Sequence, residues 1–102
     1  MSYDHELGLI GQQITEDEIG NQVPTDKEPV IILCRLKSVG RSEFYNAAAA
    51  GMRPELVFII HLFEYSGERK VEFEGVRYNV LRTYAAGSEE LELMCERVAA
   101  DG

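Results

Sequence analysis

The stretch Glu55–Tyr65, ELVFIIHLFEY, is the most apolar segment of this 102-residue chain. Successive side chains of a strand point to opposite faces, and both sets are largely apolar or aromatic here. A strand that is covered on both faces lies in the middle of a closed barrel or under a partner subunit. The segment therefore predicts the central strand of a β-rich fold.

The segments around this strand predict further strands. Val30–Val39 is rich in β-branched residues and follows a proline, which favours a strand start. Lys70–Phe73 and Val76–Tyr84 flank Glu74-Gly75, a two-residue link whose glycine tolerates the positive φ of a hairpin turn. These strands succeed one another through short links, which indicates antiparallel pairing.

One short helix is predicted between Val39 and the central strand. Ser42 suits the N-cap, Glu43 suits the first turn, and an alanine run follows,. Gly51 suits the left-handed position after the helix, and Pro54 prevents its continuation,. Because helix nucleation is costly, such a short helix is marginal alone, and we expect a helical excursion from a sheet.

The two ends of the chain are less decisive. Leu7–Thr15 predicts a weak strand, since glycines interrupt it,. Glu16–Pro29 carries acidic residues, Gly20-Asn21 and two prolines, and indicates an exposed loop or loose hairpin tip. Glu89–Val98 fits a strand or a helix about equally well, and periodicity leaves this choice open.

Together these elements predict one mainly β domain over residues 1–102. Its fold is a small six-stranded antiparallel β-barrel or sandwich, with one short helix inserted between the second and third strands. A domain of this size folds alone with little margin, and oligomerisation would help it.

The charge balance excludes a nucleic-acid-binding role. Asp and Glu number 18 against 10 Lys and Arg, a formal net charge of −8, and duplex DNA is held largely by Lys and Arg on its phosphates. An acidic surface suits a protein that DNA slides past without binding, although plain solubility explains the charge equally well.

No residue pattern indicates catalysis, a metal or a cofactor. His5 and His61 have no partner spacing for zinc, and the acidic clusters lack the spacing of a calcium loop,. No phosphate-binding glycine loop or nucleophile motif is present. Cys34 and Cys95 lie in apolar stretches, where free cysteines are usually buried, and a disulfide stays open. We expect a protein that is not an enzyme, made in the cytoplasm without a leader or membrane span.

The segment from Arg41 to Arg53 has the composition of an interface. It combines a basic residue at each end with Phe44, Tyr45 and small alanines, and aromatic side chains anchor interfaces. The alternative is a helix that only plugs one end of its own barrel. In a ring of subunits, the same helix could cap its own barrel and also contact a neighbouring subunit.

Several motifs resemble those of phage head–tail joining proteins. They are the acidic turn EDEIGNQ (16–22), CRLKSV (34–39), RSEFYNA (41–47), the strand from Leu56, the hairpin FEGVRYNV (73–80) and the ending LELMCE (91–96). The resemblance covers most of the chain, from Leu7 to Val98, in consistent order. It also favours a strand for Glu89–Val98.

The resemblance implies a head-closure protein. Proteins of that kind form a ring, here expected to be dodecameric, below the portal complex, where they retain packaged DNA and offer a docking surface to the tail. The expected partners are further copies of the chain, the portal or adaptor complex, and tail-completion or tail proteins. The protein would occur in the host cytoplasm during assembly and then in the virion neck.

Two groups of residues carry the expected contacts. The subunit or channel interface is expected at Arg41, Ser42, Glu43, Phe44, Tyr45 and Arg53. A portal-side contact is expected at the acidic turn, with Glu16, Asp17, Glu18 and Asn21.

Three other functions stay open from the sequence. The first is a tail-completion or tail-terminator protein of the neck, and the second is a β-barrel binding module unrelated to phage, which an exposed sheet edge would favour. The third is an enzyme, which would need a pocket with shifted carboxylate or histidine pKa values.

Overall fold

The computed structural model describes residues 3–98 and contains eight strands, one α-helix and one 3-10 helix. The elements are β1 (His5–Ile10), β2 (Gln12–Glu16), β3 (Gln22–Asp26), β4 (Val30–Lys37), α1 (Arg41–Ala49), β5 (Leu56–His61), η1 (Leu62–Glu64), β6 (Lys70–Phe73), β7 (Val76–Ala86) and β8 (Glu90–Arg97).

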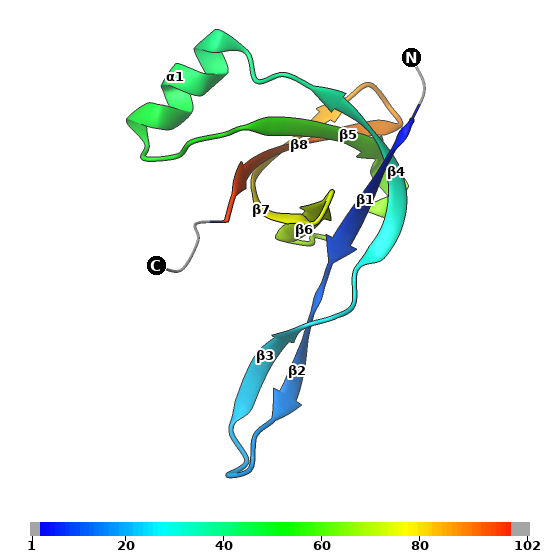
Figure 1. The fold of residues 1–102 in the computed structure, drawn as a ribbon, viewed down its shortest axis with the longest axis vertical. Helices are drawn as coiled ribbons and strands as arrows, with labels where there is room; N and C mark the ends of the chain where they lie inside the picture. Colours follow the sequence, from blue (N-terminus) through cyan, green and yellow to red (C-terminus); the bar gives the residue numbers. More distant parts are fainter. Residues whose placement is uncertain (1–2, 99–102) are drawn as a thin grey trace.

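Six of the strands form a closed antiparallel barrel (Figure 1). Around the barrel the order is β1-β4-β5-β8-β7-β6, and β1 closes the ring of strands by pairing with β6. The prediction of a mainly β fold with a six-stranded antiparallel barrel is confirmed, and the barrel replaces the sandwich alternative. Closure leaves no free edge among these six strands.

The interior of the barrel is apolar and aromatic. Phe58 lies at its centre, with ring centroids 5.2 Å from Phe73 and 5.7 Å from Tyr78. Aliphatic and cysteine side chains from the inward faces of β1, β4, β6 and β8 complete the core: Leu7, Leu9, Ile32, Cys34, Val71, Leu91, Leu93 and Cys95, with Ile60 from β5.

The central strand β5 is buried on both faces, as its sequence predicts. Phe58 and Ile60 point into the barrel, whereas Val57 belongs to a second, outer cluster with Ala47 of α1 and Met94 of β8. The helix therefore packs on the outside of the barrel wall and does not plug an end of the barrel.

Two local predictions near the C-terminus are settled. Glu74 (φ 51°) and Gly75 (φ 78°) form the expected tight turn between β6 and β7. Glu89–Val98 is a strand, because β8 pairs with β5 on one side and β7 on the other. Leu81 has no partner in the β7–β8 register, and this bulge places its side chain against the outer cluster,.

The N-terminal third differs from the prediction. β1 ends at Ile10, and β2 and β3 form a separate two-stranded hairpin, hereafter the arm (Gln12–Asp26), which projects away from the barrel in Figure 1. The expected position of the helix between the second and third strands is therefore wrong, because α1 follows the fourth strand. The strands of the arm are exposed on both faces. Their sequences therefore lack the alternation of apolar and polar residues from which a strand is predicted.

The start of the helix also differs. The N-cap is Gly40, without a side-chain hydrogen bond, and Ser42 lies inside the first turn. Glu43 lies in the first turn and Gly51 has φ 82°, as predicted. Within residues 3–98 no helix is long and apolar enough to cross a membrane.

Candidate assembly surfaces

The helical segment, Arg41–Arg53, is held to the barrel by few side chains. Ala47 is the buried residue of α1, and it packs with Val57 and Met94 on the barrel wall. Val39, Met52 and Leu81 surround this contact. A nine-residue helix is marginal by itself,, so its stability depends on this small outer cluster.

The remaining faces of the helical segment point to solvent. Tyr45 is 65% exposed and Phe44 is 40% exposed, and their rings lie edge to face with centroids 6.0 Å apart. Large exposed aromatic side chains are typical anchors of interfaces. Of the residues predicted for the interface, the structure thus brings Phe44 and Tyr45 together on one exposed surface.

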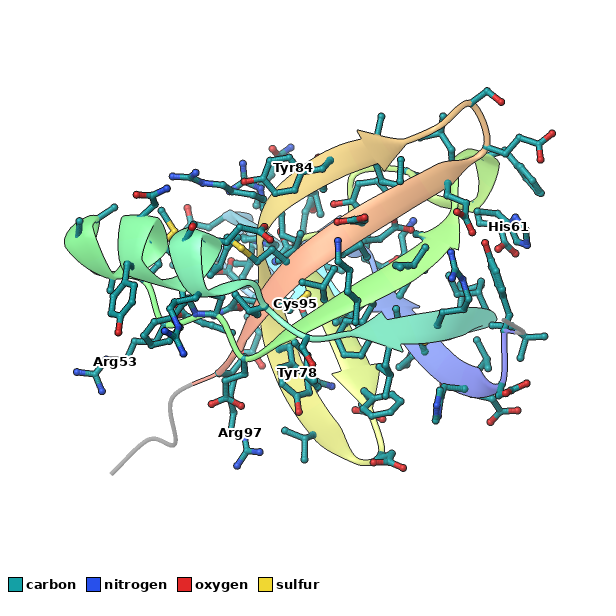
Figure 2. All side chains as sticks on the ribbon, turned by 90° about the horizontal axis from the view of Figure 1, so that it is seen from above. Arg53, His61, Tyr78, Tyr84, Cys95 and Arg97 are labelled. Carbon is teal, nitrogen blue, oxygen red and sulfur yellow. The ribbon has the colours of Figure 1, made fainter. Side chains whose placement is uncertain are left out.

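The charged residues of this segment are distributed along it. Arg41 begins α1 and Arg53 follows its end, after the chain has turned back through Gly51 so that the Met52 N–H bonds to the Ala47 carbonyl. Figure 2 shows Arg53 projecting beyond the end of the molecule that carries α1. Neither arginine forms an ion pair with another residue of the range 3–98, and both are exposed. Ser42 is exposed and Glu43 is half-buried.

The arm carries the second predicted surface at its tip. Asp17 accepts hydrogen bonds from the backbone N–H groups of Ile19 (3.0 Å) and Asn21 (2.8 Å), and Gly20 has φ 84°. Asp17 therefore shapes the turn, whereas Glu16, Glu18 and Asn21 are exposed around it. Ile19, 82% exposed, adds an apolar side chain to this acidic turn.

The arm has little structural support of its own. Its ladder pairs Ile14 with Pro24 and Thr15 with Val23, and Ile14 and Val23 remain exposed. An isolated two-stranded hairpin is marginal in water. The outer edges of β2 and β3 are not paired within the described part of the chain, so the arm offers backbone groups as well as apolar side chains to a partner.

Asp26 fixes the base of the arm to the barrel. Its carboxylate pairs with Arg77 on β7 at 3.1 Å and with Lys70 on β6 at 3.6 Å. Partial burial acts to raise the pKa of Asp26, but the hydrogen bond from Gln12 and the charges of Lys70 and Arg77 lower this pKa below its usual value,. This joint could not be predicted from the sequence, because its partners are far apart along the chain.

A polar cluster that the sequence did not reveal ties the segment before β1 to the barrel. Tyr3 donates a hydrogen bond to the carboxylate of Glu90, and Arg35 donates to the same carboxylate at 2.8 Å. The Tyr3 ring stacks on His61 with centroids 4.4 Å apart, and the Arg35 guanidinium lies 5.4 Å from the Tyr3 centroid. The hydrogen bond from Tyr3 has the largest effect in lowering the pKa of Glu90, and the hydrogen bond from Arg35 has the next largest.

The two cysteines are buried and free in the core. Burial raises the pKa of Cys34 to about 11 and that of Cys95 to about 12, so both thiols stay protonated near neutral pH. In residues 3–98 no group of three or more His, Cys, Asp or Glu side chains is arranged to hold a metal ion.

Comparison with known proteins gives no family assignment. No protein-family model matches the chain, and no curated protein matches it significantly.

Proposed function

We propose that the protein is a structural head-closure or head–tail connector protein of a phage or prophage. Copies of the chain would form a ring below the portal, retain packaged DNA and provide the surface to which the tail docks. The expected neighbours are other copies, the portal complex and tail-completion or tail proteins. In this function the protein acts through its contact surfaces, without catalysis or a cofactor.

The observation that carries this proposal is the exposure of the helical segment. α1 buries Ala47 alone among its residues, while Phe44 and Tyr45 present aromatic surface to solvent. A helix of this length that is attached to a closed barrel by one buried residue gains stability from any second surface that covers it. This is the segment that the resemblance assigns to ring contacts.

Two further features support the same function. The arm projects from the barrel (Figure 1) and ends in the acidic turn around Asp17, which suits a contact reaching out to the portal. The formal net charge of −8 disfavours attachment to DNA phosphates, as a channel that releases its genome requires.

The first test is deletion of the gene from an inducible prophage, followed by electron microscopy of the lysate beside wild type. We expect free tails together with heads that have lost or leak their packaged DNA. Heads that keep their DNA beside tails of abnormal length or with unfinished ends would place the protein on the tail side. Normal joined particles would overturn both neck functions.

Complementation then tests the helical segment itself. A Phe44→Ala/Tyr45→Ala variant should lower the titre of infectious particles by roughly tenfold or more, because truncated aromatic anchors cost interfaces most of their affinity. Asn46→Ala is the matched control, since Asn46 is an exposed residue of the same helix. Equal titres for the two variants, with both shown to be folded by circular dichroism, would contradict the role of the aromatic pair.

A second candidate is a peptide-binding module unrelated to phage, and one observation favours it. The strands of the arm keep open outer edges, which an extended peptide could pair with,. This function predicts normal particles after the deletion. It also predicts that substitution of proline for Ile14, whose backbone N–H faces the outer edge of β2 in the β2–β3 register, abolishes binding of partner peptides.

A further inference from the structure

A hollow in the barrel wall lies on the side of the molecule away from the helical segment. Gly8 of β1 and Ile31 of β4 are among the residues that line it. The hollow has a volume of about 360 Å³, and four carboxylates surround it: Asp4, Glu6, Glu72 and Glu74, with His5 and Phe73 completing the lining. We call this surface the Gly8 hollow.

The Gly8 hollow joins apolar and acidic surface. Ile31 is 60% exposed, and Leu33, which pairs with Glu6 across the β1–β4 ladder, is 51% exposed. Glu72 pairs with Arg77 at 3.5 Å, whereas Asp4, Glu6 and Glu74 form no ion pair with residues of the described chain. Its best partner is therefore apolar and positively charged.

The helical segment has this complementary character. It presents Phe44 and Tyr45 on α1, with Arg41 at the start of the helix and Arg53 after its end. Neither arginine forms an ion pair within residues 3–98, and Glu43 is the one acidic residue of the segment. For a chain of net charge −8, this local excess of basic residues is what allows two copies to approach without general repulsion.

The two surfaces lie on opposite sides of the barrel. In the barrel order β1-β4-β5-β8-β7-β6 the strand across from β1 is β8, and α1 packs over β8 and β5 through Met94 and Val57. Figure 1 likewise places α1 and β1 on opposite sides. The chain's own helix therefore cannot reach its Gly8 hollow, but that of a second copy can.

We propose that the helical segment of one copy docks in the Gly8 hollow of the next, with Phe44 and Tyr45 against Ile31 and the arginines against the carboxylate rim. A contact between two different patches on opposite sides is head-to-tail, and repetition of such a contact builds a ring or a filament. Symmetric pairing of two helical segments, or of two hollows, is disfavoured because like charges would meet. The inference rests on the proposed ring and names the surface that receives the helix.

Disulfide trapping of the purified chain tests this contact. One cysteine replaces Ala48, which lies on the face of Phe44 and Tyr45 by helical spacing,, and a second replaces Ile31 in the hollow. The natural cysteines are buried and do not interfere. Under copper–phenanthroline oxidation, Ala48→Cys/Ile31→Cys should give a ladder of dimers, trimers and higher species. The matched control Ala48→Cys/Thr83→Cys, whose second site is exposed on β7, should give at least about tenfold less of the species above dimer.

Charge reversal gives an independent readout on the same two-cysteine chain. Glu6→Lys or Arg53→Glu alone should lower the yield of trimers and higher species about tenfold, and the two together in one chain should restore it, because each interface again joins opposite charges. A ladder no stronger than that of the Thr83 control, or a double variant that shows no recovery, would overturn the proposed contact.

The crosslinking experiment and the gene deletion test the head-to-tail contact and the head-closure function separately. A strong ladder with normal phage particles would keep the head-to-tail contact and remove the head-closure function. Free tails and leaking heads without a ladder would keep the function and exclude the Gly8 hollow as the receiving surface.

Discussion

Asp26 on β3 accepts a hydrogen bond of 3.1 Å from the guanidinium of Arg77 on β7, 51 residues away, and thereby joins the base of the arm to the barrel. Lys70 on β6 adds a second cation to the same carboxylate. The exposed strands of the arm contribute no burial of their own. Asp26 is therefore the side chain that links the arm to the barrel, beside the backbone hydrogen bond from the Lys27 N–H to the Gly11 carbonyl.

Replacement of Asp26 should loosen the arm without unfolding the barrel. In Asp26→Ala we expect amide hydrogen exchange to rise several-fold across Gln12–Asp26 and to stay unchanged in β5, because only the arm loses an anchor. Hydrogen exchange monitored by mass spectrometry measures both regions at once. Glu28→Ala is the control, since Glu28 is exposed and forms no ion pair within residues 3–98. Increased exchange in both regions would contradict a purely local joint.

The same joint should weaken in acid. The pKa of Asp26 is lower in the folded chain than its ordinary value of 3.8, so its ion pairs stabilise the arm above that value and are lost as the pH falls through the folded-state pKa. Exchange-rate differences between wild type and Asp26→Ala, compared at neutral and acidic pH, should shrink in acid. A difference that persists unchanged would show that charge is not the cause.

The buried thiols should be unreactive until the chain unfolds. Cys34 and Cys95 are buried and have raised pKa values, so a thiol reagent such as DTNB should label neither quickly in native protein and both in urea. Fast labelling of native protein would contradict the buried placement.

Ionisation of these thiols should also destabilise the fold in alkali. The thiols of the unfolded chain ionise with the ordinary pKa of 9.0, whereas burial raises the pKa to about 11 for Cys34 and to about 12 for Cys95 in the folded chain. Their contribution to stability is therefore complete below pH 9.0 and declines as the pH rises through this window,. Urea unfolding of wild type and Cys95→Ala on both sides of pH 9.0 measures it, and the variant should show the weaker decline.

Truncation of the central aromatic residue should cost much of the stability. Phe58 is fully buried between Phe73 and Tyr78, and Phe58→Ala should lower the free energy of unfolding by about 3–5 kcal/mol. Phe63→Ala, at a position 81% exposed, should change it by about 0.5 kcal/mol or less. Similar losses in the two variants, measured by urea denaturation, would contradict this placement of the core.

Gly8 should tolerate no side chain. A Cβ built there would lie 2.8 Å from Cβ of Pro29, a rigid neighbour, whereas a Cβ at Gly11 would meet only the Lys27 side chain at 3.6 Å. Gly8→Ala should therefore destabilise the chain by about 1–3 kcal/mol, and Gly11→Ala should not. Thermal unfolding of the two variants measures this difference. A lower melting temperature for Gly8→Ala alone indicates close packing at Gly8, whereas equal losses indicate a general effect of replacing a glycine.

Segments with a strong local signal could be predicted from sequence. Burial of β5 on both faces followed from its unbroken apolar run, and the β6–β7 hairpin followed from Glu74-Gly75, where the turn itself demands positive φ. The aromatic pair Phe44 and Tyr45 was placed on a helix because the alanine run and Gly51 define that helix locally. The N-cap was wrong, since Gly40 begins the helix although Ser42 has the better capping side chain.

Other features depend on residues that are distant in sequence. The exposed hairpin tip was among the predictions for Glu16–Pro29, but the paired strands β2 and β3 were not. These strands are stabilised by their mutual ladder and by Asp26, not by an apolar face. The cluster of Tyr3, Arg35 and Glu90 and the rim of the Gly8 hollow likewise combine side chains from strands that meet only when the barrel closes.

The sequence by itself determined the β-rich class, the central strand, the hairpin turn and the short helix, because apolar periodicity and turn chemistry act over a few residues. Tertiary structure decided that β8 is a strand, which periodicity had left open and only the motif resemblance favoured. It alone decided that β1 closes the barrel on β6, and that the helical segment and the Gly8 hollow lie on opposite sides. These outcomes follow from strand pairing and packing between distant segments, where the free energy of contacts across the barrel exceeds the small local preference for strand or helix.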